Sequence, residues 1–137
     1  MANALFVNYK NLILGAGTHT LPDWDTDTLA VFLIDSADHT VNLSTDIDEA
    51  DITGAAIVAE TALAGETISA GAVDATDTTF SSVTGDSAEN ILISKNNGGT
   101  ASTSPLMVFF DTATGLPVTP NSGNIIVQWN ASGIIGF

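Results

Sequence analysis

The chain has 137 residues, and its sixteen acidic residues are opposed by only two lysines and no arginine, which gives a net charge of −14. Proteins that bind nucleic acid or anionic membranes do so through lysine and arginine, so this composition excludes both as partners. Cysteine is absent and the only histidines are His19 and His39, which excludes disulfides and thiolate metal sites and leaves few side chains for catalysis.

The composition predicts one folded domain that covers residues 1–137. Hydrophobic residues make up 45% of the chain, too many for a disordered acidic segment, whereas charged residues make up only 13%. The surface must therefore consist largely of Thr, Ser, Asn and Gly, which is typical of exposed β-sheets and their turns. The apolar runs are too short for a transmembrane helix, and no signal peptide is expected at the N-terminus.

The N-terminal residues predict the only helix, over Ala4–Leu14, within a helix or arm that spans about residues 1–17. Asn3 is expected to cap this helix, and Gly15 or Gly17 to end it. Apolar side chains recur along it at helical spacing, namely Leu5, Tyr9, Leu12 and Ile13. A helix this short must dock on something, either on the sheet of its own chain or, as an arm, on a neighbouring subunit.

The rest of the chain is predicted to form strands and turns. The segments Leu29–Ile34 and Pro105–Asp111 contain the longest apolar runs, which predicts strands covered on both faces. The other predicted strands are Thr40–Leu43 (or an extended loop), Ala55–Thr61, Glu66–Ser69, Thr78–Val83, Asn90–Lys95, Asn124–Asn130 and Ile134–Phe137. About seven to nine short strands with turns between them predict an all-β fold, a β-sandwich or jelly-roll-like barrel with one short N-terminal helix.

Two acidic clusters are candidate cation sites. The segment Asp23-Trp24-Asp25-Thr26-Asp27 places oxygen ligands at alternating positions, which suits Ca²⁺, but Thr28 and Ile34 stand where an EF-hand loop has Gly and Glu. The second cluster consists of Asp46, Asp48, Glu49 and Asp51. Both clusters are predicted to be solvated turns, so neither a metal ion nor a cofactor is expected.

Catalytic patterns are also scarce. Both histidines lie beside threonines in loop-like segments, and the chain contains no Gly-x-Ser-x-Gly elbow. Abundant carboxylates alone do not predict a glycosidase, because sugar sites normally add aromatic platforms and the chain has only two Trp and one Tyr. The chain is therefore not expected to be an enzyme.

The two apolar strands bear on the oligomeric state. A small sandwich has a single interior, so one side of each doubly covered strand needs cover from the helix or from a partner chain. Low surface charge together with surplus apolar strand faces favours a homo-oligomer, such as a trimer closed by point symmetry.

Several segments resemble a family of small β-rich virion proteins of tailed bacteriophages, similar to head decoration proteins. The most specific is Asp-Thr-Ala-Thr-Gly-Leu-Pro-Val-Thr-Pro-Asn, at Asp111–Asn121. The other similar segments are Met1–Leu5, Leu33–Asp38, Thr79–Asp86, Ile91–Lys95 and the flanks of the first segment within Phe110–Ile125. The resemblance covers most of the chain and implies a structural protein without enzymatic activity.

This resemblance and the charge together imply a function. The interior of a phage head holds dense DNA, which repels a chain of this charge, so we expect the protein on the outer capsid surface after its synthesis in the bacterial cytoplasm. We expect a capsid decoration (cement) protein that binds the major capsid protein of the mature head as a homotrimer and bridges capsomers. A tail, tail-fibre or baseplate component is one alternative, and a carbohydrate- or receptor-binding β-sandwich module is another.

The candidate interface consists of large apolar residues of the predicted helix, one tryptophan and the last aromatic residue. These residues are Leu5, Phe6, Tyr9, Trp24 and Phe137. Each of them could equally belong to the core, so their exposure decides between the two interpretations.

Overall fold

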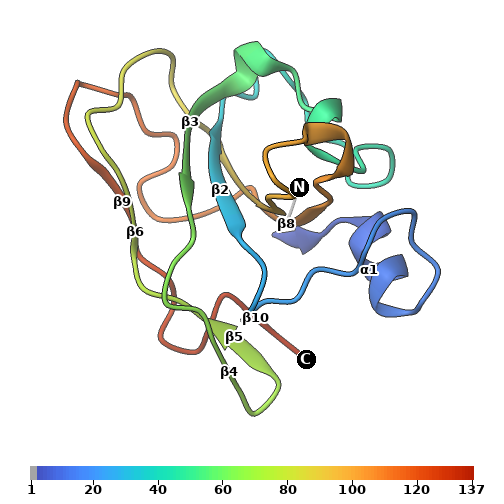
Figure 1. The fold of residues 1–137 in the computed structure, drawn as a ribbon. Coiled ribbons are helices and arrows are strands. Elements are labelled where there is room, and N and C mark those ends of the chain that lie inside the picture. The colour runs from blue at the N-terminus through green and yellow to red at the C-terminus, as the bar shows by residue number, and fades with distance from the viewer. Residues whose placement is uncertain (1–2) are drawn as a thin grey trace.

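The computed structural model describes residues 3–137, which form a mostly β structure with one short helix (Figure 1). A five-stranded antiparallel sheet has the order β1 (Ala4–Leu5), β8 (Leu106–Phe110), β7 (Asn90–Lys95), β2 (Leu29–Ile34) and β3 (Ile57–Ala62). A three-stranded sheet has the order β10 (Ile135–Gly136), β5 (Ala72–Asp74) and β4 (Thr67–Ser69). A two-stranded ribbon pairs β6 (Thr78–Phe80) with β9 (Ile125–Val127). The helix α1 spans Val7–Ile13, and three 3₁₀ turns lie at η1 (Glu49–Asp51), η2 (Gly54–Ala56) and η3 (Ala101–Thr103).

Strand β2 lies inside the largest sheet, and all six of its residues are buried. It pairs with β7 on one side and with β3 on the other, so that Val31 lies opposite both Ile93 and Thr61. A strand between two neighbours has no free edge, and an apolar strand of this kind is stable only if both sheet faces are also covered. The prediction that Leu29–Ile34 is a doubly covered strand is confirmed.

One face of the sheet, which carries Phe32 and Phe109, is covered from the N-terminal side of the chain. The rings of Phe6 and Phe109 meet edge to face, with their centroids 6.4 Å apart. Ile52, which follows η1, lines a small void together with Phe32, so the segment around η1 also lies over this face. We call this side of the sheet the helix face.

The opposite face, which carries Leu33 and Phe110, is covered by the C-terminal part of the chain. The rings of Phe110 and Trp129 lie 5.7 Å apart, and Leu33 forms part of a groove whose other wall includes Ile125–Gln128. We call this side the ribbon face, because the β6–β9 ribbon lies over it. Both faces of β2 are thus covered within one chain, and a homotrimer remains a prediction that the burial of this strand does not require.

The N-terminal segment differs from the prediction. The helix begins at Val7 rather than Ala4, because Ala4 and Leu5 pair with β8 as the edge strand β1. Asn3 does not cap the helix. Its Oδ1 instead accepts hydrogen bonds from the backbone N–H groups of Asp111 (2.8 Å) and Thr112 (3.0 Å), which ties the start of the chain to the end of β8.

The helix ends where it was expected to end, at Gly15. Gly15 adopts φ +83°, and its N–H donates to the carbonyl of Leu12 while Ala16 N–H donates to the carbonyl of Asn11. This pair of bonds is the Schellman arrangement, which favours glycine because a left-handed backbone is strained for other residues.

Most of the other predicted strands are present with shifted ends. Thr40–Leu43 forms no strand, and the predicted start at Ala55 is replaced by the turn η2, so β3 begins at Ile57. The strand β5, which pairs with both β4 and β10, was not predicted, because three residues between turns carry no clear alternation. No helix in the described part of the chain is long and apolar enough to cross a membrane.

The central position of β2 predicts how substitutions in this strand change the free energy of unfolding. Phe32 is 3% exposed, so Phe32→Ala should lower the free energy of unfolding by about 3–5 kcal/mol, through lost burial and the cavity left behind. Ile126→Ala serves as the control, since Ile126 is 58% exposed, and it should change that free energy by less than about 0.5 kcal/mol. Urea unfolding measures both, and equal effects would contradict the assignment of β2 to the core.

Candidate interaction surface

The structure divides the five candidate interface residues into two groups. Phe6, Tyr9 and Trp24 are buried in the hydrophobic core, and Leu5 packs against that core while partly exposed. Phe137 is 75% exposed. The side chains of the first three are therefore internal in the isolated chain, which is the alternative that the sequence left open, and only Phe137 presents most of its surface outward.

Tyr9 and Trp24 form a buried polar contact that fastens the segment after the helix. The indole Nε1 of Trp24 donates to Tyr9 Oη at 2.7 Å. Burial raises the pKa of Tyr9, with the bond from Trp24 acting in the opposite direction. Because the Trp24 ring is enclosed, it offers no exposed platform for a sugar.

Trp129 is also engaged within the chain. It is partly buried, its Nε1 donates to Thr78 Oγ1 at 3.1 Å, and its ring lies beside Phe110. Neither tryptophan is therefore a free aromatic platform, which weakens the interpretation of the chain as a carbohydrate-binding module.

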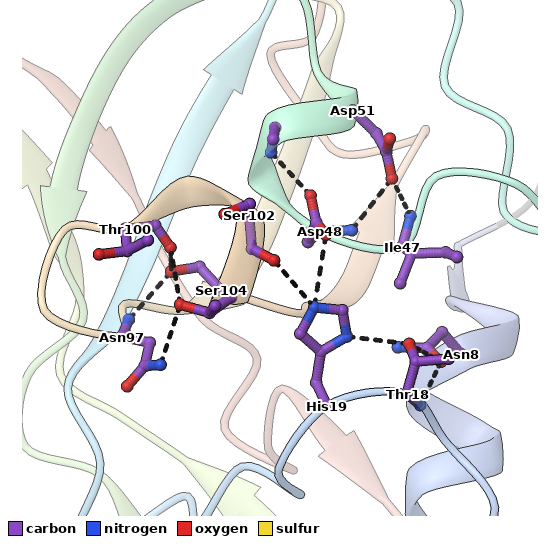
Figure 2. Close-up of polar contacts among 12 residues, drawn as sticks. Asn8, Thr18, His19, Ile47, Asp48, Asp51, Asn97, Thr100, Ser102 and Ser104 are labelled. Atoms are coloured by element: carbon purple, nitrogen blue, oxygen red, sulfur yellow. Dashed lines mark hydrogen bonds and ion pairs between the residues drawn. The ribbon is translucent and has the colours of Figure 1, made fainter.

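His19 joins four segments of the chain (Figure 2). Its Nε2 lies 3.1 Å from the carbonyl oxygen of Ser102, within η3, and 3.3 Å from Oδ2 of Asp48, which precedes η1. Its Nδ1 lies 3.0 Å from Thr18 Oγ1, and Thr18 in turn donates to Asn8 Oδ1 in α1. The imidazole thus connects the helix, the loop after it and two 3₁₀ turns.

His39 has a comparable arrangement of hydroxyl, imidazole and carboxylate. Its Nε2 lies 3.0 Å from Asp46 Oδ2 and its Nδ1 lies 3.3 Å from Thr53 Oγ1. A catalytic triad would require this order of groups beside a pocket that holds the substrate. The principal cavities found among residues 3–137 are lined by other residues, so we interpret both histidines as ties between loops.

In both acidic clusters predicted from the sequence, carboxylate oxygens accept hydrogen bonds from backbone N–H groups. In the first, Asp27 Oδ2 accepts the N–H of Asp23 at 2.8 Å and lies 2.9 Å from Lys95 Nζ. Burial alone would raise the pKa of Asp27, but the Asp23 N–H and Lys95 outweigh it and hold the pKa below its ordinary value. In the second, Asp48 and Asp51 form a capping box around η1.

A third acidic cluster was not found from the sequence. Carboxylate oxygens of Asp35, Asp38 and Asp86 lie within 4.8 Å of one another, a spacing that could hold a metal ion. Asp35 is buried, whereas the other two are exposed. This cluster could not be recognised from the sequence, because Asp86 comes from a distant turn that folds back toward the end of β2.

A groove of about 510 Å³ lies on the ribbon face. Its floor includes Leu33 and Ile91, and its walls come from residues 113–116, Val118 and residues 124–128. None of the residues that line it is charged, although the chain carries sixteen acidic residues. The groove is therefore suited to an uncharged group rather than an ion.

The remaining exposed apolar side chains are spread over the surface. Three of them, Ile13, Leu14 and Leu21, belong to the end of α1 and the segment after it. Ile68 lies on β4 and Ile126 on β9. With Phe137, these side chains are the large apolar contacts that the described surface offers to a partner.

Comparison with known proteins adds no family assignment: no protein-family model matches the chain, and no curated protein matches it at a significant level.

The Trp24–Tyr9 contact can be tested by removing a single hydroxyl group. Tyr9→Phe leaves the buried Nε1 of Trp24 without an acceptor, so the free energy of unfolding should fall by about 1–3 kcal/mol. Thermal unfolding followed by tryptophan fluorescence measures this loss. An unchanged midpoint would show that solvent reaches the indole and that Trp24 is not enclosed.

The burial of Glu49 predicts how the stability of the protein depends on pH. It is partly buried over the helix face, where Ser94 Oγ donates to its Oε1. Burial raises the pKa of Glu49 above its ordinary 4.5, and the carboxylates of Glu60 and Asp48 raise it further, whereas the Ser94 bond lowers it. Because the folded state then holds this proton more tightly than the unfolded state, the contribution of Glu49 to stability is lost as pH rises from 4.5 through the folded pKa.

We therefore expect Glu49→Gln to be more stable than the unchanged protein at pH 8, with the difference shrinking as pH falls to 4.5 and below. The amide oxygen of Gln can still accept from Ser94, so the variant mainly removes the charge. Urea unfolding at a series of pH values measures the difference. A constant difference across this range would contradict the raised pKa.

Proposed function

We propose that this protein is a structural component of a tailed-bacteriophage virion that decorates the outside of the mature head. The observation that carries the proposal is the charge of −14 with only two lysines, placed on a small β-rich fold. Charge of this sign is repelled by packaged DNA and is tolerated on an outer surface. The resemblance of Asp111–Asn121 and its flanking segments to virion proteins supports the same location.

The mechanism would be stabilisation by binding. A protein that binds only the mature lattice, and contacts two neighbouring capsomers at once, lowers the free energy of the assembled shell relative to its separated parts. We propose the major capsid protein as the partner and a homotrimer at local threefold positions as the bound form. Closed point symmetry of this kind gives each subunit the same contacts.

The surface area is sufficient for such contacts. The accessible surface is 6735 Å², and a stable interface takes about 800 Å² from each partner. Apolar anchors for it are available in Leu14, which is 81% exposed, and Phe137, which is 75% exposed. These two side chains replace the buried Phe6, Tyr9 and Trp24 as our candidate contacts with the shell.

We also propose that the fold is a β-sandwich. The arrangement in support of this class is the β6–β9 ribbon over the ribbon face of the five-stranded sheet, with the groove between them. A jelly-roll-like barrel is less well supported, because the strands of the described chain divide into three separate sheets.

The alternatives differ in what they predict for a virus particle. A tail, tail-fibre or baseplate component would share the β-rich fold and acidic charge but occur in fewer copies. A carbohydrate- or receptor-binding module would need exposed aromatic or polar groups that recognise a sugar, and the enclosed tryptophans do not favour it.

Counting copies in a purified particle tests the proposal. A decoration protein that repeats with the lattice should occur in on the order of hundreds of copies, whereas a tail component should occur in a few dozen or fewer. Quantitative mass spectrometry against the major capsid protein measures this ratio. Light scattering of the purified chain should show a trimer, and a monomer with no affinity for empty mature heads would refute the proposal.

A further inference from the structure

The groove on the ribbon face is bordered along one side by an edge of strand β9. Five consecutive residues, 124–128, line the groove, whereas no residue of β6 lines it. Because side chains alternate between the two faces of a strand, an unbroken run of lining residues shows that the strand presents an edge to the groove. The other edge of β9 is paired with β6 (Figure 1). The edge that borders the groove is therefore the one that β6 leaves free, and we call it the outer edge of β9.

Strand β9 is the last in a series of neighbouring strands that starts in the five-stranded sheet. β6 and the residues before it lie along β3, where Thr76 N–H and Oγ1 donate to the carbonyl of Ala64 at 3.0 Å and 2.7 Å. The outer edge of β3 is thus covered within the chain. β9 lies beyond β6, with the groove on its far side. The outer edge of β9 is therefore the place where a further strand can pair with this series.

The hydrogen bonds at both ends of β9 show which of its backbone groups point toward the groove. Before the strand, the carbonyl of Gly123 accepts the N–H of Val83, which follows β6, at 2.9 Å. After the strand, Trp129 N–H donates at 3.2 Å to Oδ1 of Asp77, which precedes β6. Hydrogen-bonding directions alternate along a strand, so the odd-numbered residues of β9 bond toward β6 and the even-numbered residues point away from it. The even-numbered residues in question are Ile126 and Gln128.

These outward groups have no partner across the groove. Within residues 3–137, no backbone hydrogen bond joins Ile126 or Gln128 to the opposite wall. That wall is held by bonds of its own, since Val118 and Ala88 exchange two backbone bonds of 2.9 Å and Leu116 N–H donates to the carbonyl of Ala113. The outer edge of β9 therefore offers donors and acceptors at the spacing of a strand, and a second strand is the group that matches this spacing.

The lining of the groove decides the chemistry of such a strand. Leu33 and Ile91 at the floor are 1% and 4% exposed, and no lining residue is charged. A charged side chain turned toward this floor would lose its water without gaining a partner. A negatively charged segment is also repelled by the net charge of −14. An uncharged segment avoids both costs and buries its apolar side chains over the floor.

The size of the groove disfavours a second copy of this chain as the occupant. A hollow of about 510 Å³ between two walls suits one extended segment, whereas β9 of a second copy would bring its own β6 and its own groove wall with it. The apolar strands β2, β7 and β8 cannot serve either, because they are buried inside the five-stranded sheet. The occupant is therefore a segment of a different protein.

We propose that the groove binds one extended polypeptide segment of another protein, in which apolar side chains alternate with uncharged polar ones. The segment pairs with the outer edge of β9 through the outward groups of Ile126 and Gln128. Its apolar side chains lie over Leu33 and Ile91. This interaction goes beyond the proposed function, because it follows from the groove itself and its test requires no virus particle.

The test uses three eight-residue peptides with blocked ends. In the first, Thr alternates with Val; in the second, Lys replaces each Val; in the third, the four central residues of the first peptide are N-methylated. The first should bind, with changes in the NMR amide signals of Ile126 and Gln128 and slower hydrogen exchange at both. The other two should bind at least roughly tenfold more weakly, because one buries charges and the other lacks backbone donors.

Two substitutions at one position locate the site. Ile126→Pro removes an outward N–H without removing a bond to β6, and it should abolish binding of the first peptide. Ile126→Val is the matched control, because it keeps both the N–H and a branched side chain, and it should bind this peptide within about twofold of the unchanged chain. Protection of the β2 amides from hydrogen exchange shows whether each variant keeps the fold.

Several results would overturn the proposal. Equal binding of the first and the N-methylated peptide would show that no strand is added, as would equal binding by Ile126→Pro and Ile126→Val. Tighter binding of the Lys peptide would show that the net charge governs the contact. A dimer of the unchanged chain that Ile126→Pro dissociates would show that a second copy occupies the edge. If Ile126→Pro does not fold, the comparison of the first and third peptides still decides the outcome.

Discussion

The complete burial of β2 is the constraint on which the rest of this structure depends. Its six apolar residues pair with β7 and β3 at both edges, and they require cover on both faces of the sheet. The N-terminal part of the chain supplies cover through Phe6 and the segment around η1, and the C-terminal part supplies it through the β6–β9 ribbon. The chain must therefore close over the sheet from both ends.

A second constraint, the shortage of lysine and arginine, determines how the acidic groups on the surface are bonded. With sixteen carboxylates and two lysines, most acidic groups cannot form ion pairs. Many instead accept backbone N–H groups, as Asp48 and Asp51 do around η1, and as Glu89 does from Ser36. These bonds fix the turns between strands. They also leave the net charge of the molecule uncompensated, so that its field is available to a cationic partner.

Some elements of this fold can be predicted from neighbouring residues, whereas others depend on residues that are far apart in the sequence. The strands β2, β7 and β8 were predicted because apolar runs between turn residues carry their own signal. The helix began three residues later than predicted, because the pairing of Ala4 and Leu5 with β8 depends on residues more than a hundred positions away. The burial of Phe6 and Trp24 could not be separated from an interface role, since sequence shows that a side chain is apolar but not what covers it. For the same reason the cluster of Asp35, Asp38 and Asp86 could not be predicted, because its residues come together only when distant turns meet in the fold.

The two constraints together indicate how this chain can interact without a large apolar face. Its core is enclosed by its own segments, so an apolar partner surface is not needed to complete the fold. What it offers to a partner is a negatively charged surface that carries a few large apolar side chains, such as Leu14 and Phe137.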